Sequence, residues 1–93
     1  MSNYVQPIKE TLEQLGCDQE LTALYTLLAL IKGKEVTMKD VHDAWAVWKN
    51  NIDPTHKSLI PYDELSREVK NLDAEYTNAI YEAAPEPHKE NTK

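Results

Sequence analysis

The sequence predicts an all-α domain, a compact bundle of four main helices with an ordered, proline-containing loop between the third helix and the fourth. Three observations support this fold class. Apolar residues recur at helical spacing in four segments, capping residues, glycine or proline separate these segments, and the one strand-like pair, Leu59-Ile60, has no segment to pair with. The 93 residues suffice for one small core. We therefore expect a single helical domain over residues 1–84 and a disordered polar tail over residues 85–93.

The first helix is predicted within residues 4–15, and Gly16 is expected to end it by adopting a left-handed conformation. Asp18 is the expected N-cap of a second helix over residues 19–32. Apolar residues cover most of the circumference of this second helix, which is typical of a helix in the middle of a domain or at an oligomer interface. The width of its apolar surface therefore predicts a homo-oligomer.

The third helix is predicted to begin near Met38, because Thr37 and Asp40 form a variant of the capping box. Its inner face is expected to carry four apolar or aromatic residues: Val41, Trp45, Trp48 and Ile52. The segment that follows is expected to be extended or turn-like up to Pro61, because prolines disfavour a helical conformation in the residue before them.

The fourth helix is predicted to follow a short helical turn over residues 62–65, with Ser66 as its N-cap and Pro85 beyond its end. Its apolar residues at helical spacing are Val69, Leu72, Tyr76, Ala79, Ile80 and Ala83. The expected core of the bundle draws on all the elements from the second helix onward: Leu24, Leu28, Trp45, Leu59, Leu72 and Tyr76.

Charge and composition exclude several classes of partner. The net charge of −6 argues against binding nucleic acid polymers, which requires a concentrated basic face. The longest apolar run, Leu21 to Ile31, is too short and too often interrupted to span a bilayer, and no signal-peptide pattern opens the sequence. The single Cys17 fits a reducing compartment. These features predict a cytoplasmic protein that binds neither membranes nor nucleic acid polymers.

Three stretches of the second half combine residue types that rarely occur together. Residues 41–46 read Val-His-Asp-Ala-Trp-Ala, residues 56–66 read His-Lys-Ser-Leu-Ile-Pro-Tyr-Asp-Glu-Leu-Ser, and Glu68, Lys70 and Asp73 follow. Together they resemble the RyR domain, the small helical module that is repeated in ryanodine receptors and occurs alone in bacteria and phages. The resemblance covers residues 41–80. Only residues 50–55 replace the longer aromatic, glycine and charged insertion that RyR domains usually carry at this place.

The resemblance implies a small helical module that senses or sequesters a nucleotide-derived signal in bacterial or phage defence, and it implies no catalytic residues. The residues themselves also indicate a protein that is not an enzyme and needs no metal or cofactor. The adjacent Asp63 and Glu64 would point in different directions from a helical turn, and Cys17 has no neighbouring base. The three histidines lack the spacing of a metal site.

Five residues combine hydrogen-bond donors with aromatic faces, as a nucleotide pocket requires, and they form the predicted ligand site: Trp48, His56, Lys57, Ser58 and Tyr62. Lys32, Lys34 and Lys39 offer a second place for an anion at the start of the third helix. The favoured alternative is that Lys32 complements the end of the preceding helix and that Lys34 and Lys39 are solvated. The leading hypothesis is a non-enzymatic module that binds a small nucleotide-derived ligand. The alternative is an adaptor that docks on another protein through exposed Leu27 and Leu30.

Overall fold

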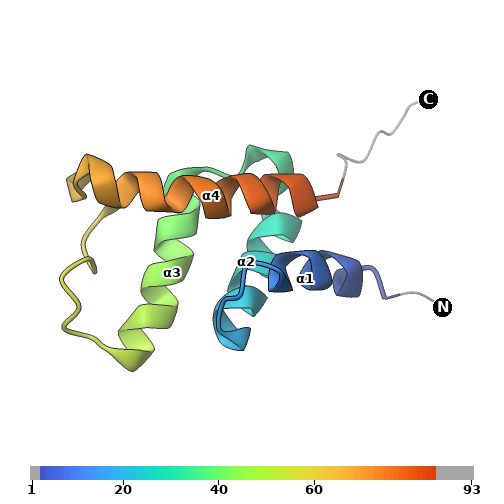
Figure 1. Ribbon diagram of the computed structural model, residues 1–93, viewed down its shortest axis with the longest axis horizontal. Helices are drawn as coiled ribbons and strands as arrows, with labels where there is room; N and C mark the ends of the chain where they lie inside the picture. Colours follow the sequence, from blue (N-terminus) through green and yellow to red (C-terminus); the bar gives the residue numbers. More distant parts are fainter. Residues whose placement is uncertain (1–2, 86–93) are drawn as a thin grey trace.

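A computed structural model describes residues 3–85, and within them every regular element is a helix (Figure 1). The elements follow one another as α1 (Val5–Glu13), α2 (Gln19–Ile31), the short 3-10 helix η1 (Gly33–Glu35), α3 (Met38–Ile52), the 3-10 helix η2 (Tyr62–Glu64) and α4 (Arg67–Ala83). The predicted all-α bundle of four main helices is confirmed. The predicted disordered tail falls, apart from Pro85, outside the described residues.

The two central helices, α2 and α3, pack side by side, and α4 crosses both of them (Figure 1). The first helix packs on α2 and also reaches α4. At the far end of α3 the chain turns into a loop, residues 53–61, that returns along the outside of the bundle to η2 and the start of α4 (Figure 1). The loop therefore closes one side of the space between α3 and α4.

The helix boundaries follow from local chemistry that the sequence displays. Gly16 and Gly33 adopt left-handed backbone conformations, with φ of +76° and +58°, just after α1 and α2. The side chain of Asp18 accepts a hydrogen bond from the Glu20 amide at 2.8 Å and so caps α2 as predicted. These three residues fix the places where the first two helices end and begin.

The later helices begin at the predicted caps. Thr37 and Asp40 each bind the backbone amide of the other, at 3.1 and 3.0 Å, and complete the capping box of α3. The Ser66 hydroxyl accepts from the Val69 amide at 3.2 Å at the start of α4. The short helical turn expected after Pro61 is also present, as η2.

The apolar core lies where the four helices meet. Its most deeply buried side chains come from every main helix: Leu12, Tyr25, Ala29, Val41 and Ile80. Three of the residues predicted for the core are half-buried and pack against this centre: Leu28, Trp45 and Tyr76. Leu24 and Leu59 are also half-buried.

Two of the predicted inner residues lie outside the core, and both predictions are wrong. Leu72 is 67 % exposed and Ile52 is also exposed. On α4 the inner stripe runs from Val69 through Asp73 to Ile80, so the polar Asp73 occupies the inner position that hydrophobicity alone assigns to its neighbour Leu72. The inner side of α4 therefore includes a polar residue, Asp73, where an apolar residue is expected.

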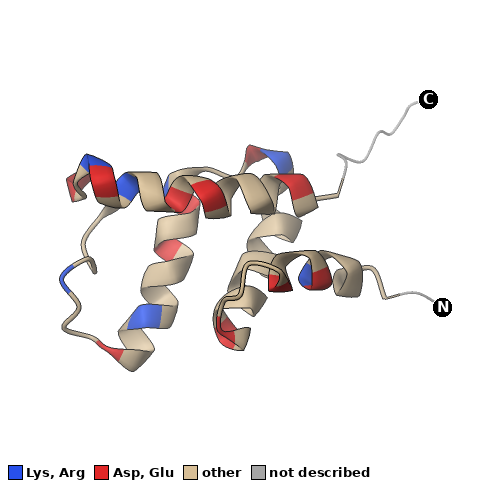
Figure 2. Cartoon of the chain, in the orientation of Figure 1, with Lys and Arg blue, Asp and Glu red and all other residues tan. Residues whose placement is uncertain are grey.

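Charged side chains are interspersed along the helices, and the part of the chain that the structure describes has no continuous basic stretch (Figure 2). None of the helices within residues 3–85 combines the length and the hydrophobicity needed to cross a bilayer.

Candidate functional site

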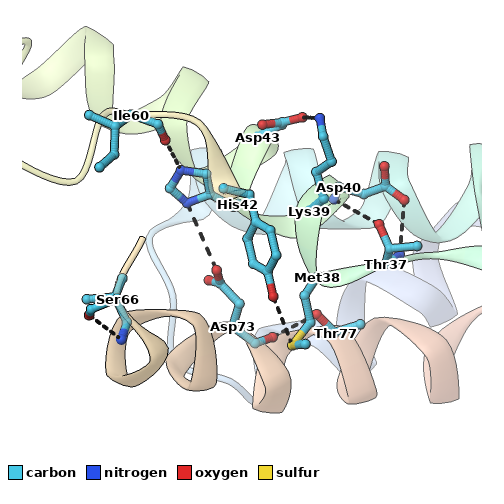
Figure 3. Close-up of polar contacts among 12 residues, drawn as sticks. Thr37, Met38, Lys39, Asp40, His42, Asp43, Ile60, Ser66, Asp73 and Thr77 are labelled. Atoms are coloured by element: carbon cyan, nitrogen blue, oxygen red, sulfur yellow. Dashed lines mark hydrogen bonds and ion pairs between the residues drawn. The ribbon is translucent and has the colours of Figure 1, made fainter. Parts of the chain in front are cut away.

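A histidine occupies the interior between α3 and the loop. His42 is only 2 % exposed, and its Nε2 lies 2.7 Å from the carbonyl oxygen of Ile60 (Figure 3). Because a carbonyl oxygen can only accept, Nε2 carries the proton and donates it. This hydrogen bond fastens the loop to α3, and it satisfies a main-chain carbonyl next to Pro61.

The other ring nitrogen of His42 faces a carboxylate on α4. The Nδ1 atom lies 4.0 Å from Oδ2 of Asp73 (Figure 3). That distance is too long for a hydrogen bond, and Asp73 Oδ2 is buried without a hydrogen-bond partner among the described residues. Burial raises the pKa of the Asp73 carboxyl, and the neighbouring His42 acts in the opposite direction.

Four rings form a row beside this pair. His42 stacks on Trp45, with ring centroids 5.6 Å apart, since residues three positions apart on a helix share one face. Trp45 meets His56 edge-on at 5.3 Å, and Tyr62 lies 6.3 Å from His42 on the other side. The row connects α3 to both ends of the loop region. Three of its rings, those of His42, Trp45 and His56, line a cavity.

This cavity has a volume of about 560 Å³ and lies between α2, α3, α4 and the loop. Small-molecule sites typically measure about 300–1,000 Å³ and combine apolar walls with a few polar groups. The cavity fits that description. Its lining residues are Leu21, Tyr25, His42, Trp45, His56, Lys57, Ser58, Val69, Asn71, Leu72, Asp73, Glu75 and Tyr76.

Three of the five predicted ligand residues line the cavity, and all three belong to the loop. They are His56, Lys57 and Ser58. The Ser58 amide donates to Nδ1 of His56 at 3.0 Å, so the proton of the neutral ring lies on Nε2, which is left as a donor. The loop therefore presents an imidazole N–H, an ammonium group and a hydroxyl within three consecutive residues.

The other two predicted residues lie outside the cavity. The Trp48 indole donates to Oδ1 of Asp18 at 3.3 Å, the carboxylate that caps α2, and so joins α3 to the start of α2. The Tyr62 hydroxyl donates to Sδ of Met38 at 3.9 Å, and the Lys70 ammonium lies 5.1 Å from the centre of the Tyr62 ring. The structure thus does not bring the five predicted residues together.

Several lining residues were not predicted as ligand contacts. Trp45 was assigned to the core, yet it lines the cavity in the place expected for Trp48. His42 and Asp73 were not assigned to the site at all. A signal for both exists in the sequence, because each falls on the inner stripe of its helix, where a polar residue needs a partner.

Burial disfavours charge on the tyrosines that line the α2 and α4 sides of the cavity. It raises the pKa of the hydroxyls of Tyr25 and Tyr76, so both remain neutral at physiological pH. Burial, reinforced by Glu75, also raises the pKa of the nearby Cys17 thiol. Lys57 on the loop and the carboxylates of α4 therefore supply the charges at the cavity.

The lysines near the start of α3 all have partners within the chain. Lys32 lies 3.7 Å from Asp40, and Lys39 lies 3.3 Å from Asp43. The Lys34 ammonium donates to the carbonyl oxygen of Tyr81 at 2.8 Å. Because each ammonium group already has a partner within the chain, these lysines act in holding the fold together rather than as an anion site. Among residues 3–85, no three His, Cys, Asp or Glu side chains lie close enough together to hold a metal ion.

A family model described as a domain of unknown function, DUF7701, matches residues 3–85. No curated protein and no solved structure matches the chain. The family match does not bear on the resemblance to the RyR domain, which stays a prediction.

Proposed function

The chain belongs to the DUF7701 family, a family of unknown function, and we propose that it is a non-enzymatic module that binds a small nucleotide-derived ligand in the cavity between α3, α4 and the loop. The proposal rests on the positions of three kinds of group around the cavity. Donors lie together on the loop, aromatic rings form the wall on α3, and carboxylates lie on α4. A nucleotide offers a matching combination of anion, planar ring and base N–H groups.

The loop is the side suited to a phosphate group. His56, Lys57 and Ser58 offer three kinds of donor within one short segment. The cavity also contains Glu75 and Asp73, whose negative charge would repel a ligand with many phosphates. A ligand with one or two phosphate groups therefore suits the cavity better than a polyphosphate.

The aromatic residues suit a planar base. Trp45 and Tyr76 both line the cavity, from α3 and α4 respectively. Stacking of a base on an aromatic side chain contributes on the order of 1–3 kcal/mol. The carboxylate of Glu75 and the amide of Asn71 can accept hydrogen bonds from exocyclic amino groups and so select among bases.

Both histidines at the cavity use one ring nitrogen to hold the loop, so they position the donors of the proposed binding site. His42 donates to the Ile60 carbonyl, and His56 accepts from the Ser58 amide. The resemblance to the RyR domain adds the biological setting to the proposal, namely capture of a nucleotide-derived signal in bacterial or phage defence, in the cytoplasm.

A thermal-shift panel of cyclic and linear nucleotides tests the proposal. A ligand at a hundredfold its dissociation constant should stabilise the fold by about 2.7 kcal/mol. The shift should decrease in Lys57→Ala and Ser58→Ala, which remove donors of the cavity. It should persist in Lys39→Ala, which removes an exposed lysine far from the cavity on α3. If no nucleotide of the panel shifts the wild-type transition, the proposal is wrong.

A further inference from the structure

One surface of the bundle exposes large apolar side chains close together. Leu27 and Ile31 of α2 are 50 % and 65 % exposed, and Val47 of α3 is 59 % exposed. They surround a shallow groove of about 310 Å³ between the two helices. We call this surface the apolar face and define it by Leu24, Leu27, Leu28, Ile31, Ala44 and Val47. Leu30, which was predicted to be exposed beside Leu27, instead packs against the core.

The apolar face continues past Val47 onto the loop. A second hollow, of about 350 Å³, lies on the other side of this residue and is lined by Ile60 and Pro61 among others. Asp43 and Val47 line both hollows, so the two form one surface. Contiguous exposed apolar surface of this kind marks an interaction site in a folded domain.

The groove between α2 and α3 lies on the opposite side of α3 from the cavity, and the two share no lining residue, whereas the second hollow shares only His42 with the cavity. Trp45 points into the cavity, whereas Asp43 and Val47, four residues apart, share the other side of the helix. A partner on the apolar face would therefore leave the cavity open. The inference about this face is independent of any ligand in the cavity.

The charged residues around the apolar face balance one another. Lys32 lies beside Asp40 and Lys39 beside Asp43, so the rim carries two cations and two anions. The whole chain, in contrast, has a net charge of −6, which makes two copies repel one another at most orientations. The apolar face is a place where two copies can meet without bringing net charge together.

We propose that a second copy of this chain covers the apolar face, with α2 and α3 of one protomer packed on α2 and α3 of its partner about a twofold axis. A twofold interface uses the same patch on both subunits, so the patch must complement itself. Apolar residues at the centre and equal numbers of both charges at the rim meet this condition. A strongly basic or strongly acidic partner would find no net charge at the rim to complement.

A dimer of standard size sets the area that the face would have to supply. A standard interface buries about 800 Å² per partner, roughly one-eighth of the 6394 Å² of accessible surface of this chain. The two helices of the face, with 13 and 15 residues, each extend for roughly 20 Å. Two such pairs, packed face to face, form a four-helix interface of the kind common in helical oligomers.

Sedimentation velocity of the purified chain over a wide range of concentration tests this inference. The wild type should show a concentration-dependent monomer–dimer equilibrium. Leu27→Lys and, separately, Val47→Lys should weaken the dimer by at least roughly 30-fold, because each places two unpaired charges in the buried centre. Leu72→Lys is the matched control, since Leu72 is also an exposed leucine but lies on α4, outside the face.

Far-UV circular dichroism should show the same helicity in all four proteins, because the substituted side chains are exposed. If one variant of the face fails to fold, the other decides. A wild-type chain that remains monomeric at every concentration overturns the inference. This holds even if the face of that monomer binds a different protein. A dimer that Leu27→Lys and Val47→Lys leave intact overturns it too.

Discussion

The two halves of α4 are held in place by different chemistry. The second half contributes Ile80 to the apolar core, where it packs with residues of α1 and α2 and is fully buried. The first half presents Asp73 to His42 and borders the cavity. The second half of α4 thus stabilises the fold by hydrophobic burial. The first half instead contributes a buried polar group and borders the cavity proposed to bind a ligand.

The largest effect is expected from the apolar half. Ile80→Ala removes three carbons from a fully buried site and should lower the free energy of unfolding by about 2–5 kcal/mol. Chemical denaturation followed by circular dichroism measures the change. Leu72→Ala, on the same helix but exposed, should stay within about 0.5 kcal/mol of the wild type. Equal losses in the two variants would contradict the division of α4 into an inner apolar half and a half that borders the cavity.

His42→Ala tests the polar half directly. It leaves the Ile60 carbonyl without its donor and should cost roughly 1–3 kcal/mol. The effect should be local: hydrogen exchange should accelerate at loop amides such as that of Leu59, which donates to the His56 carbonyl, more than at the amides of α1. Asn50→Ala, an exposed change on the same helix, should leave the loop protected. A uniform acceleration throughout the chain would show that the loop has no separate anchor.

Ser66→Ala removes the cap at the start of α4 and should cost about 1 kcal/mol. The loss should concentrate at the first turn of the helix, because the Val69 amide loses its acceptor. Ser66→Asp supplies another capping oxygen and should restore most of the stability. Failure of this rescue would mean that the hydroxyl acts through some other contact.

The smallest effect concerns pH. The pKa of Asp73 is raised in the folded chain, so the folded state holds this proton more tightly than the unfolded state does. The associated stability is present below the ordinary aspartate pKa of about 3.9 and is lost as pH rises through the folded value. Asn at position 73 cannot titrate. The free energy of unfolding of Asp73→Asn should therefore rise relative to that of the wild type over the pH interval that begins at about pH 4. A constant difference over this interval would contradict the assignment.

Most of the fold can be predicted from the sequence because local chemistry sets it. The caps at Asp18, Thr37 and Ser66 and the left-handed glycines need only neighbouring residues to act. The helical period of the apolar residues then indicates which sides face inward. All four main helices begin within a residue or two of the predicted positions.

The candidate site is harder to predict because its residues come together only in the folded chain. A prediction from hydrophobicity alone places His42 and Asp73 on the solvated side of their helices. Their inward positions are explained only by the folded chain, in which the two side chains face one another. Trp45 and Trp48 lie three positions apart, and the sequence does not indicate which of them meets the cavity and which meets the Asp18 cap. The loop residues were predictable because their donors are adjacent in sequence.

The different surroundings of the two tryptophans give the chain a built-in optical probe. Trp45 lies between the rings of His42 and His56, and protonated imidazole quenches indole fluorescence. Trp48 lies outside the cavity and binds the Asp18 carboxylate. Since the sequence has two tryptophans, Trp48→Phe would leave a single tryptophan, at the wall of the cavity. The emission of that variant would report on occupancy and on the protonation of its neighbours without an added label.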